Sequence, residues 1–165
     1  GTQQIQALEA NQIRGLTSTQ MSALSTTQLS ALTTAQAKTL SATQVNALSS
    51  AQIASIETAD LAALAGTTAS GLSTDSVKAL SSGQVASLNA SQLRSLSATQ
   101  LNALDTADLA AFTTAQIRAL STDAIVAMDS TDSVATVARR RFNFMEGRLR
   151  KKRGIDRVML PRFGA

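Results

Sequence analysis

The sequence has no cysteine, histidine, tryptophan or tyrosine, and it has one proline in 165 residues. Without cysteine the chain forms no disulfide or thiolate site. Without histidine and cysteine it also lacks the usual ligands of zinc and haem iron. Histidine is the commonest general acid–base residue and the base of Ser-His-Asp triads. We therefore expect a protein that is not an enzyme and that binds no metal or cofactor.

Long apolar runs and charge are also scarce. Charged residues make up 16% of the chain, against about 25% in an average protein. No apolar run approaches the roughly 20 residues that a membrane helix needs, so we predict no transmembrane segment. The chain starts at Gly1, in the middle of a repeat, and we expect it to be part of a longer protein.

What the sequence does contain is an eight-residue repeat with two apolar positions. The first position is large and apolar in all sixteen octads, and the second follows it five residues later. Glutamine dominates the position before the second apolar residue, and the pattern is L-[S/T]-x-x-Q-[I/L/V]-x-A. The first series is Leu8, Leu16, Leu24, Leu32, Leu40, Leu48, Ile56, Leu64, Leu72, Leu80, Leu88, Leu96, Leu104, Phe112, Leu120 and Met128.

The residues of each octad predict the start of a helix. In the octad that begins at Leu24, Ser25 is a favourable N-cap residue. Gln28 lies three residues later, which completes a capping box. Leu24 and Leu29 then occupy the two positions of a hydrophobic staple. Because the start repeats every eight residues, each helix can have only about six residues.

A helix this short is unstable alone, so neighbouring octads must bury its apolar side. We predict an all-α solenoid with one short helix per octad. A continuous helix would turn about 80° too far per octad and form no fixed apolar face. A β-solenoid would place residues five apart on opposite faces of a strand. Disorder conflicts with the strict apolar spacing.

Two irregularities stand out within the array. The octad at residues 64–71 lacks the cap, the glutamine and a second large apolar residue. We interpret it either as neutral drift in a redundant repeat or as a weak point or bend. The segments 57–63 and 105–111 are nearly identical and lie 48 residues apart, which suggests a longer duplication.

The last thirty residues differ from the array in charge and pattern. Residues 1–135 have five basic and nine acidic residues, whereas residues 136–165 have ten basic and two acidic residues. Apolar residues from Val134 to Leu149 recur at spacings of three and four, which predicts an amphipathic helix ending near Gly154. We therefore divide the chain into a solenoid, residues 1–135, and a basic C-terminal helix and tail, residues 136–165.

The basic helix has several possible roles. Its apolar stripe would cover the open end of the solenoid, because terminal repeats need a cap. Its basic face would suit nucleic acid, an anionic membrane surface, or an acidic protein partner, including a second copy in head-to-tail assembly. The candidate anion- or partner-binding residues are Arg139, Arg140, Arg141, Arg148, Arg150, Lys151, Lys152 and Arg153.

Carboxylates three residues apart provide the one pattern with a metal-like spacing. They occur at 57/60, 105/108 and 129/132. Oxygen ligands suit hard cations. These positions are also the N-cap and third positions of the predicted helices, where acids favour the helix dipole. We interpret them as capping residues.

The octads at residues 40–47 and 112–119 resemble repeats of large bacterial secreted or surface proteins of the hemagglutinin or adhesin type. The resemblance covers residues 1–135. It implies an extracellular spacer or adhesive role, brings no catalytic residue, and implies a location outside the cell or on its surface. The absence of cysteine fits secretion and equally fits a location in the cytoplasm. We therefore expect a structural or interaction module whose partner is another protein or a second copy. The alternative is a nucleic-acid or anionic-surface binder that acts through residues 139–153.

Overall fold

The structure is a computed structural model of the chain, and it describes residues 1–121. These residues form helices of four to six residues, with one helix in each octad, as predicted. The helices within residues 1–121 are α1 (Thr2–Ala7), α2 (Ala10–Arg14), α3 (Ser18–Ser22), α4 (Thr26–Leu29), α5 (Thr34–Ala37), α6 (Ala42–Asn46), α7 (Ser50–Ala54), α8 (Thr58–Ala63), α9 (Gly66–Ser70), α10 (Thr74–Lys78), α11 (Ser82–Ser87), α12 (Ala90–Ser95), α13 (Ala98–Leu101), α14 (Thr106–Ala110) and α15 (Thr114–Ala119). The end of the predicted array and the predicted C-terminal helix lie outside the described residues.

The predicted capping box starts most of these helices. At α4 the Ser25 hydroxyl accepts from the Gln28 amide at 3.2 Å, and Gln28 Oε1 accepts from the Ser25 amide at 2.9 Å. The same reciprocal pair, with a serine, threonine or asparagine cap, starts α3, α5, α6, α7, α11, α12, α13 and α15. Each pair satisfies amides that a helix start leaves without an intrahelical partner. The octad pattern therefore starts a new helix every eight residues.

The first apolar residue of each octad ends the preceding helix. The Leu16 amide donates to the Ile13 carbonyl at 3.2 Å, and the Leu24 amide donates to the Met21 carbonyl in the same way. Leu8 itself has extended backbone angles, with φ −68° and ψ 137°. An extended residue cannot continue a helix, so the chain changes direction at each leucine and enters the next cap.

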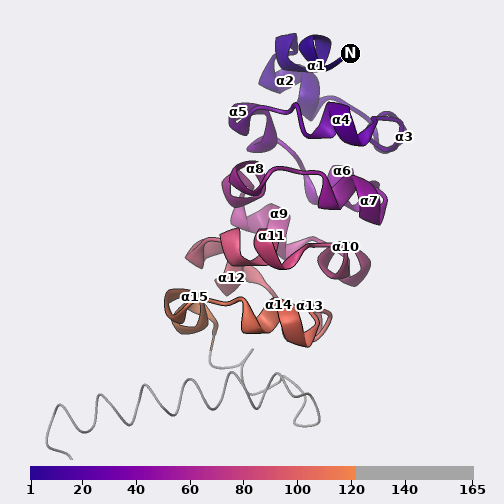
Figure 1. Cartoon of the computed structure of the whole chain (residues 1–165). Helices are drawn as coiled ribbons and strands as arrows, with labels where there is room; N and C mark the ends of the chain where they lie inside the picture. The colour runs from indigo at the N-terminus through magenta and orange to yellow at the C-terminus, as the bar shows by residue number, and fades with distance from the viewer. Residues whose placement is uncertain (122–165) are drawn as a thin grey trace, which may run out of the picture.

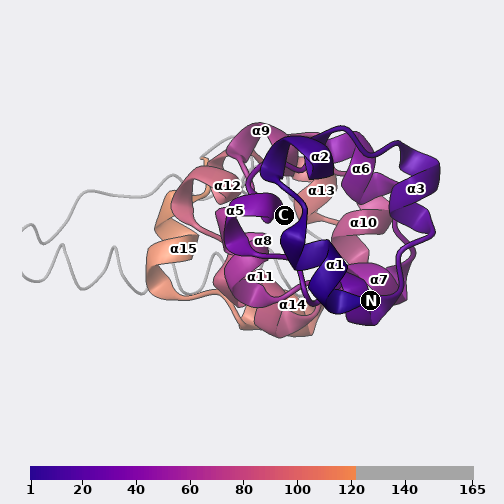
Figure 2. The same cartoon turned by 90° about the horizontal axis from the view of Figure 1, so that it is seen from above.

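The short helices wind into a superhelical column (Figure 1). Each helix packs against the helix three octads further along, as α5 does against α8 and α9 does against α12. Hydrogen bonds between turns join residues 25 to 31 apart, so one turn takes between three and four octads. Seen from the N-terminal end, the path from α5 through α6 and α7 to α8 runs clockwise as it recedes, and the superhelix is right-handed (Figure 2).

The two apolar series form one continuous core along this column. The second series is the more deeply buried, and Ile13, Met21 and Leu29 have no exposed surface. In the part of the chain described, the core contains leucine, isoleucine, valine, alanine and Met21, with a single aromatic side chain, Phe112. No helix within residues 1–121 has the length and apolarity to cross a lipid bilayer.

The irregular octad forms a helix and packs closely on both sides. Ala65, the N-cap residue of α9, makes no side-chain cap bond, as the sequence predicted. A Cβ added at Gly71 would lie 2.7 Å from the Cβ of Ala42 in α6, and one added at Gly66 would lie 3.2 Å from Ser91 Oγ in α12. The small residues of this octad therefore allow three successive turns to approach closely.

Candidate functional site: the interface between turns

Gln36 shows how one side chain holds two turns together. Its Oε1 accepts from the Thr33 amide at 2.8 Å, which is the capping bond of its own helix. Its Nε2 donates to the carbonyls of Ile5 and Leu8, both at 2.7 Å, at the end of α1 in the preceding turn. The side chain is only 2% exposed. One buried amide thus starts a helix and caps the C-terminal carbonyls of another helix.

The same arrangement recurs along the column. Gln84 Nε2 donates to the carbonyls of Ile53 and Ile56, both at 2.8 Å. Gln92, which has no exposed surface, donates to the carbonyls of Leu61 and Leu64 at 2.8 and 2.9 Å. Four more glutamines, Gln44, Gln52, Gln100 and Gln116, make equivalent bonds to the turn before them.

This double role explains why the octad uses glutamine. A capping box accepts glutamate as readily as glutamine at its third position, yet no octad has glutamate there. A carboxylate would face two carbonyl oxygens and could donate no hydrogen bond to them. The absence of glutamate was a usable signal in the sequence. Sequence reasoning assigned the glutamine to the cap alone and missed the bonds between turns.

Within residues 1–121, four octads lack the glutamine and form the contact between turns with other side chains. Thr68 donates its hydroxyl to the Leu40 carbonyl at 2.9 Å. Ser76 donates to Oδ1 of Asn46, which belongs to the turn before. Asp60 and Asp108 are buried, with 4% and 5% of their surface exposed. Their carboxylates accept hydrogen bonds of 2.8 Å from the hydroxyls of Thr34 and Ser82, respectively. No buried side-chain nitrogen or oxygen in residues 1–121 lacks a partner.

The bonds to the two aspartates also repeat with the 48-residue period suggested by the sequence. Thr34 and Ser82 are 48 residues apart, as are Asp60 and Asp108, and each hydroxyl meets its carboxylate across 26 residues. Asp105 accepts from the Asp108 amide at 2.8 Å, so this carboxylate has the capping role that we predicted. Residues 1–121 contain no group of three or more acidic side chains placed to hold a metal ion.

The first turn carries the same glutamines without a partner turn. Oε1 of Gln12 and of Gln20 accepts the cap amide of its own helix at 2.8 and 2.9 Å. Neither Nε2 has an acceptor in the described part of the chain, and both side chains are exposed. Leu8, Leu16 and Leu24 are half-buried there, whereas the corresponding leucines from Leu32 onward are buried. Within the described residues, the glutamines of the first turn therefore form only the capping bond and not the bonds between turns.

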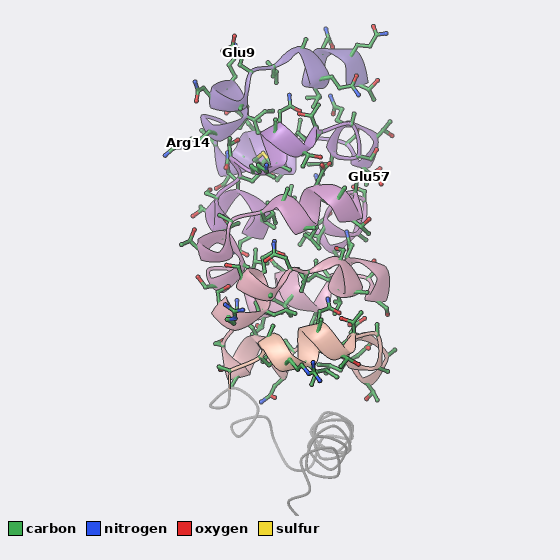
Figure 3. All side chains as sticks on the ribbon, turned by 90° about the vertical axis from the view of Figure 1, so that its left-hand side faces the viewer. Glu9, Arg14 and Glu57 are labelled. Carbon is green, nitrogen blue, oxygen red and sulfur yellow. The ribbon has the colours of Figure 1, made fainter. Side chains whose placement is uncertain are left out.

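The outer surface has charge at fixed octad positions. All basic residues of the described segment occupy the seventh position of an octad, near the end of a helix, and all are exposed: Arg14, Lys38, Lys78, Arg94 and Arg118. Cations at this position suit the negative end of the helix dipole. Arg14 projects from the side of the column and Glu9 from its N-terminal end (Figure 3). The predicted anion-binding residues, Arg139 to Arg153, lie outside the described residues.

Comparison with known proteins identifies the family to which the repeat belongs. The ALTTAQ repeat family matches residues 1–34, 53–90 and 102–135. These segments cover more than half of the chain, so the protein belongs to the ALTTAQ repeat family. No curated protein and no solved structure matches it.

Proposed function

We propose that this ALTTAQ repeat chain is a non-enzymatic structural and interaction module, which serves as a spacer or adhesive segment of a larger bacterial surface or secreted protein. The single observation that carries the proposal is the glutamine interface. Seven glutamines bind the turn before them through backbone carbonyls, and six of the seven reach the residues 28 and 31 positions earlier. An array built this way can be lengthened without changing its core, which suits a spacer.

The outward positions support an interaction role. The third position after each first-series apolar residue is exposed in every described octad, and it varies among alanine, threonine, serine, glycine, asparagine and aspartate. None of these residues belongs to the buried core. A surface that varies on a constant scaffold is the arrangement that repeat proteins use for binding.

Lengthening the array tests the spacer role. A second copy of residues 33–80 inserted after Leu80 adds six octads with matching interfaces, because Gln36 and Gln84 are equivalent across 48 residues. We expect small-angle X-ray scattering to show a longer particle with an unchanged cross-section. An inserted block of the same composition in shuffled order is the control, and it should not extend the rod. A thicker or more compact particle from the ordered insertion would contradict the proposal.

A second candidate function is the binding of nucleic acid through residues 139–153. It is supported by the concentration of basic residues in the C-terminal part of the sequence. Eight basic residues crowd this segment, whereas the basic residues of the described array occur singly. Fluorescence anisotropy with a labelled DNA oligonucleotide at about 50 and 200 mM salt tests it, because phosphate binding weakens steeply over this range. We expect binding to disappear when these eight residues are replaced by glutamine. It should persist when the five basic residues of the array are replaced instead.

A further inference from the structure

We propose that one side of the column is a docking surface for an extended chain of an acidic polysaccharide. The inference rests on the proposed interaction role and names the partner for it. The surface, which we call the basic stripe, consists of Arg14, Lys38, Arg94 and Arg118. All four side chains are exposed, and none has an ion pair or a hydrogen bond within residues 1–121. Their charges are therefore free to bind an anionic ligand.

The winding of the column brings the four cations to one side. Arg14 ends α2 and Lys38 follows α5, and these two helices pack on each other in adjacent turns. Arg94 in α12 and Arg118 in α15 form a second pair of the same kind, because α12 packs on α15. Helices α5, α12 and α15 lie on one side of the column, and α10, which contains Lys78, lies on the opposite side (Figure 2).

The two middle cations have equivalent surroundings. Lys38 precedes Thr39, whose hydroxyl donates to a backbone carbonyl 29 residues earlier. Arg94 precedes Ser95, whose hydroxyl also donates to a backbone carbonyl 29 residues earlier. The two cations are 56 positions apart, twice the 28 positions that separate a glutamine from the leucine carbonyl it meets in the turn before. They therefore occupy the same place on turns that lie two apart.

The exposed acidic residues of the described chain lie elsewhere. Asp75 is in α10, on the side opposite the basic stripe. Glu57 and Arg14 project from opposite edges of the column, and Glu9 projects from its N-terminal end (Figure 3). Asp105 starts α14, which packs on α11. Residues 1–121 contain five basic and six acidic residues, so attraction of an anion depends on where the charges lie and not on the net charge.

The shape of the stripe favours an extended polyanion over nucleic acid. Arg14 and Arg118 are 104 residues, or between three and four turns, apart. Packed helices lie about 8–10 Å apart, so the stripe is roughly 30–35 Å long. The strands of a DNA duplex wind away from a straight line within a helical turn of about 34 Å. Proteins that bind single strands add aromatic side chains for stacking, but Phe112 is buried, with 3% of its surface exposed.

Hydroxyl groups accompany the cations, which suits a sugar chain. Thr17, Ser41 and Ser97 each lie three residues after a cation of the stripe, and all three are exposed. Each accepts a backbone amide at the start of the next helix. A hydroxyl oxygen has two lone pairs, so each can also accept a hydrogen bond from a sugar hydroxyl. The stripe thus offers charge for the acidic groups and acceptors for the hydroxyls of one polymer.

Binding of fluorescein-labelled heparin, a sulfated polysaccharide, tests the stripe. The full chain is used with the eight basic residues at 139–153 replaced by glutamine, so that the tail adds no attraction. We expect fluorescence anisotropy to show binding at about 50 mM salt. It should weaken roughly fiftyfold at about 200 mM, the loss expected for four contacts at the slope of a single-stranded polyanion. Replacing the four stripe residues by glutamine as well should weaken binding at low salt at least about tenfold, because all four contacts are lost.

Lys38→Gln and Lys78→Gln form a matched pair in this chain. Both lysines are exposed at the seventh octad position, but only Lys38 belongs to the stripe. Lys38→Gln removes one contact, so it should reduce the salt effect from roughly fiftyfold to about twentyfold. Lys78→Gln should leave it unchanged. Thermal unfolding of each variant should match that of the parent, because the replaced side chains are exposed and make no bond within residues 1–121.

Three outcomes would overturn the inference: no heparin binding at about 50 mM salt, equal effects of the two lysine variants, or unchanged binding after all four stripe residues are replaced. Tighter binding of a labelled DNA oligonucleotide than of heparin by the same tail-substituted chain would overturn it too, and would assign the stripe to nucleic acid. None of these results bears on the scattering test, which concerns the length of the column, so the two proposals fail separately.

Discussion

The octads with glutamine at the interface and the three consecutive octads at residues 57–80, which have another residue there, form the contact between turns differently. In the glutamine octads one side chain serves two helices and contacts only backbone atoms of the turn before. In residues 57–80, Thr68 also bonds to a backbone carbonyl. Asp60 and Ser76, however, depend on side-chain pairs with Thr34 and Asn46. A glutamine that bonds to backbone carbonyls places no requirement on the side chains of the residues it meets. A side-chain pair requires a suitable residue at both positions.

Removing the glutamine from an inner turn should have the largest effect. Gln92→Ala removes the partner of the Asn89 amide and of the Leu64 carbonyl, and one of the two hydrogen bonds that the Leu61 carbonyl accepts. We expect a loss of about 4 kcal/mol in the free energy of unfolding, because each unsatisfied buried group costs about 1–3 kcal/mol. Denaturation followed by circular dichroism measures it.

Gln12→Ala is the control for this change. It removes the same consensus residue where no turn lies against it, so we expect a loss of no more than about 1 kcal/mol, typical of a helix cap. Equal losses in the two variants would show that the glutamine acts through the cap alone.

Gly71→Ala tests the close approach of turns in the irregular octad. The new methyl group would lie 2.7 Å from the Cβ of Ala42, and neither atom can rotate away. We expect a loss of about 2 kcal/mol, as for other overpacked cores. Gly15→Ala changes the same octad position where the nearest atoms are 3.5 Å away and φ is −80°, so it should stabilise the protein by about 0.5 kcal/mol. A neutral result at residue 71 would show that the turns can separate freely there.

Thr34→Val tests the side-chain hydrogen bond between Thr34 and Asp60. It removes the hydroxyl that donates to Asp60 and leaves that buried carboxyl oxygen without this bond. The expected loss is about 1–2 kcal/mol, measured by thermal unfolding. Thr26→Val alters the same octad position on an exposed helix start, and its effect should stay within about 0.5 kcal/mol. If both variants unfold alike, the bond to Asp60 makes no net contribution.

Restoring a missing cap should have the smallest effect. Ala65→Ser supplies the side-chain acceptor that α9 lacks, and it should raise the unfolding free energy by about 0.5–1 kcal/mol. Ala59→Ser, on the exposed face of α8, should leave it unchanged. A destabilising Ala65→Ser would mean that the start of α9 has no room for a hydroxyl.

The local part of the structure was predictable from the octad. Ser25 and Gln28 identify a helix start by their spacing alone, and Leu24 marks the end of the helix before it. The absence of glutamate indicated a second role for the glutamine, but the partners were not predictable, because they lie 28 and 31 residues earlier in the sequence. Nor did the sequence indicate that Asp60 would be buried, since an acid at that position favours an exposed helix start equally well.

The sequence by itself determined where each helix begins, how short it must be and which side chains must be buried. These properties follow from hydrogen bonds and apolar contacts within about eight residues. The tertiary structure alone decided the number of octads in a turn, the right-handed winding (Figure 2), and the carbonyl groups that each glutamine meets. The reason is geometric: the backbone angles at each join between octads set a small rotation, and only its accumulation over three to four joins brings residues 28 positions apart into contact.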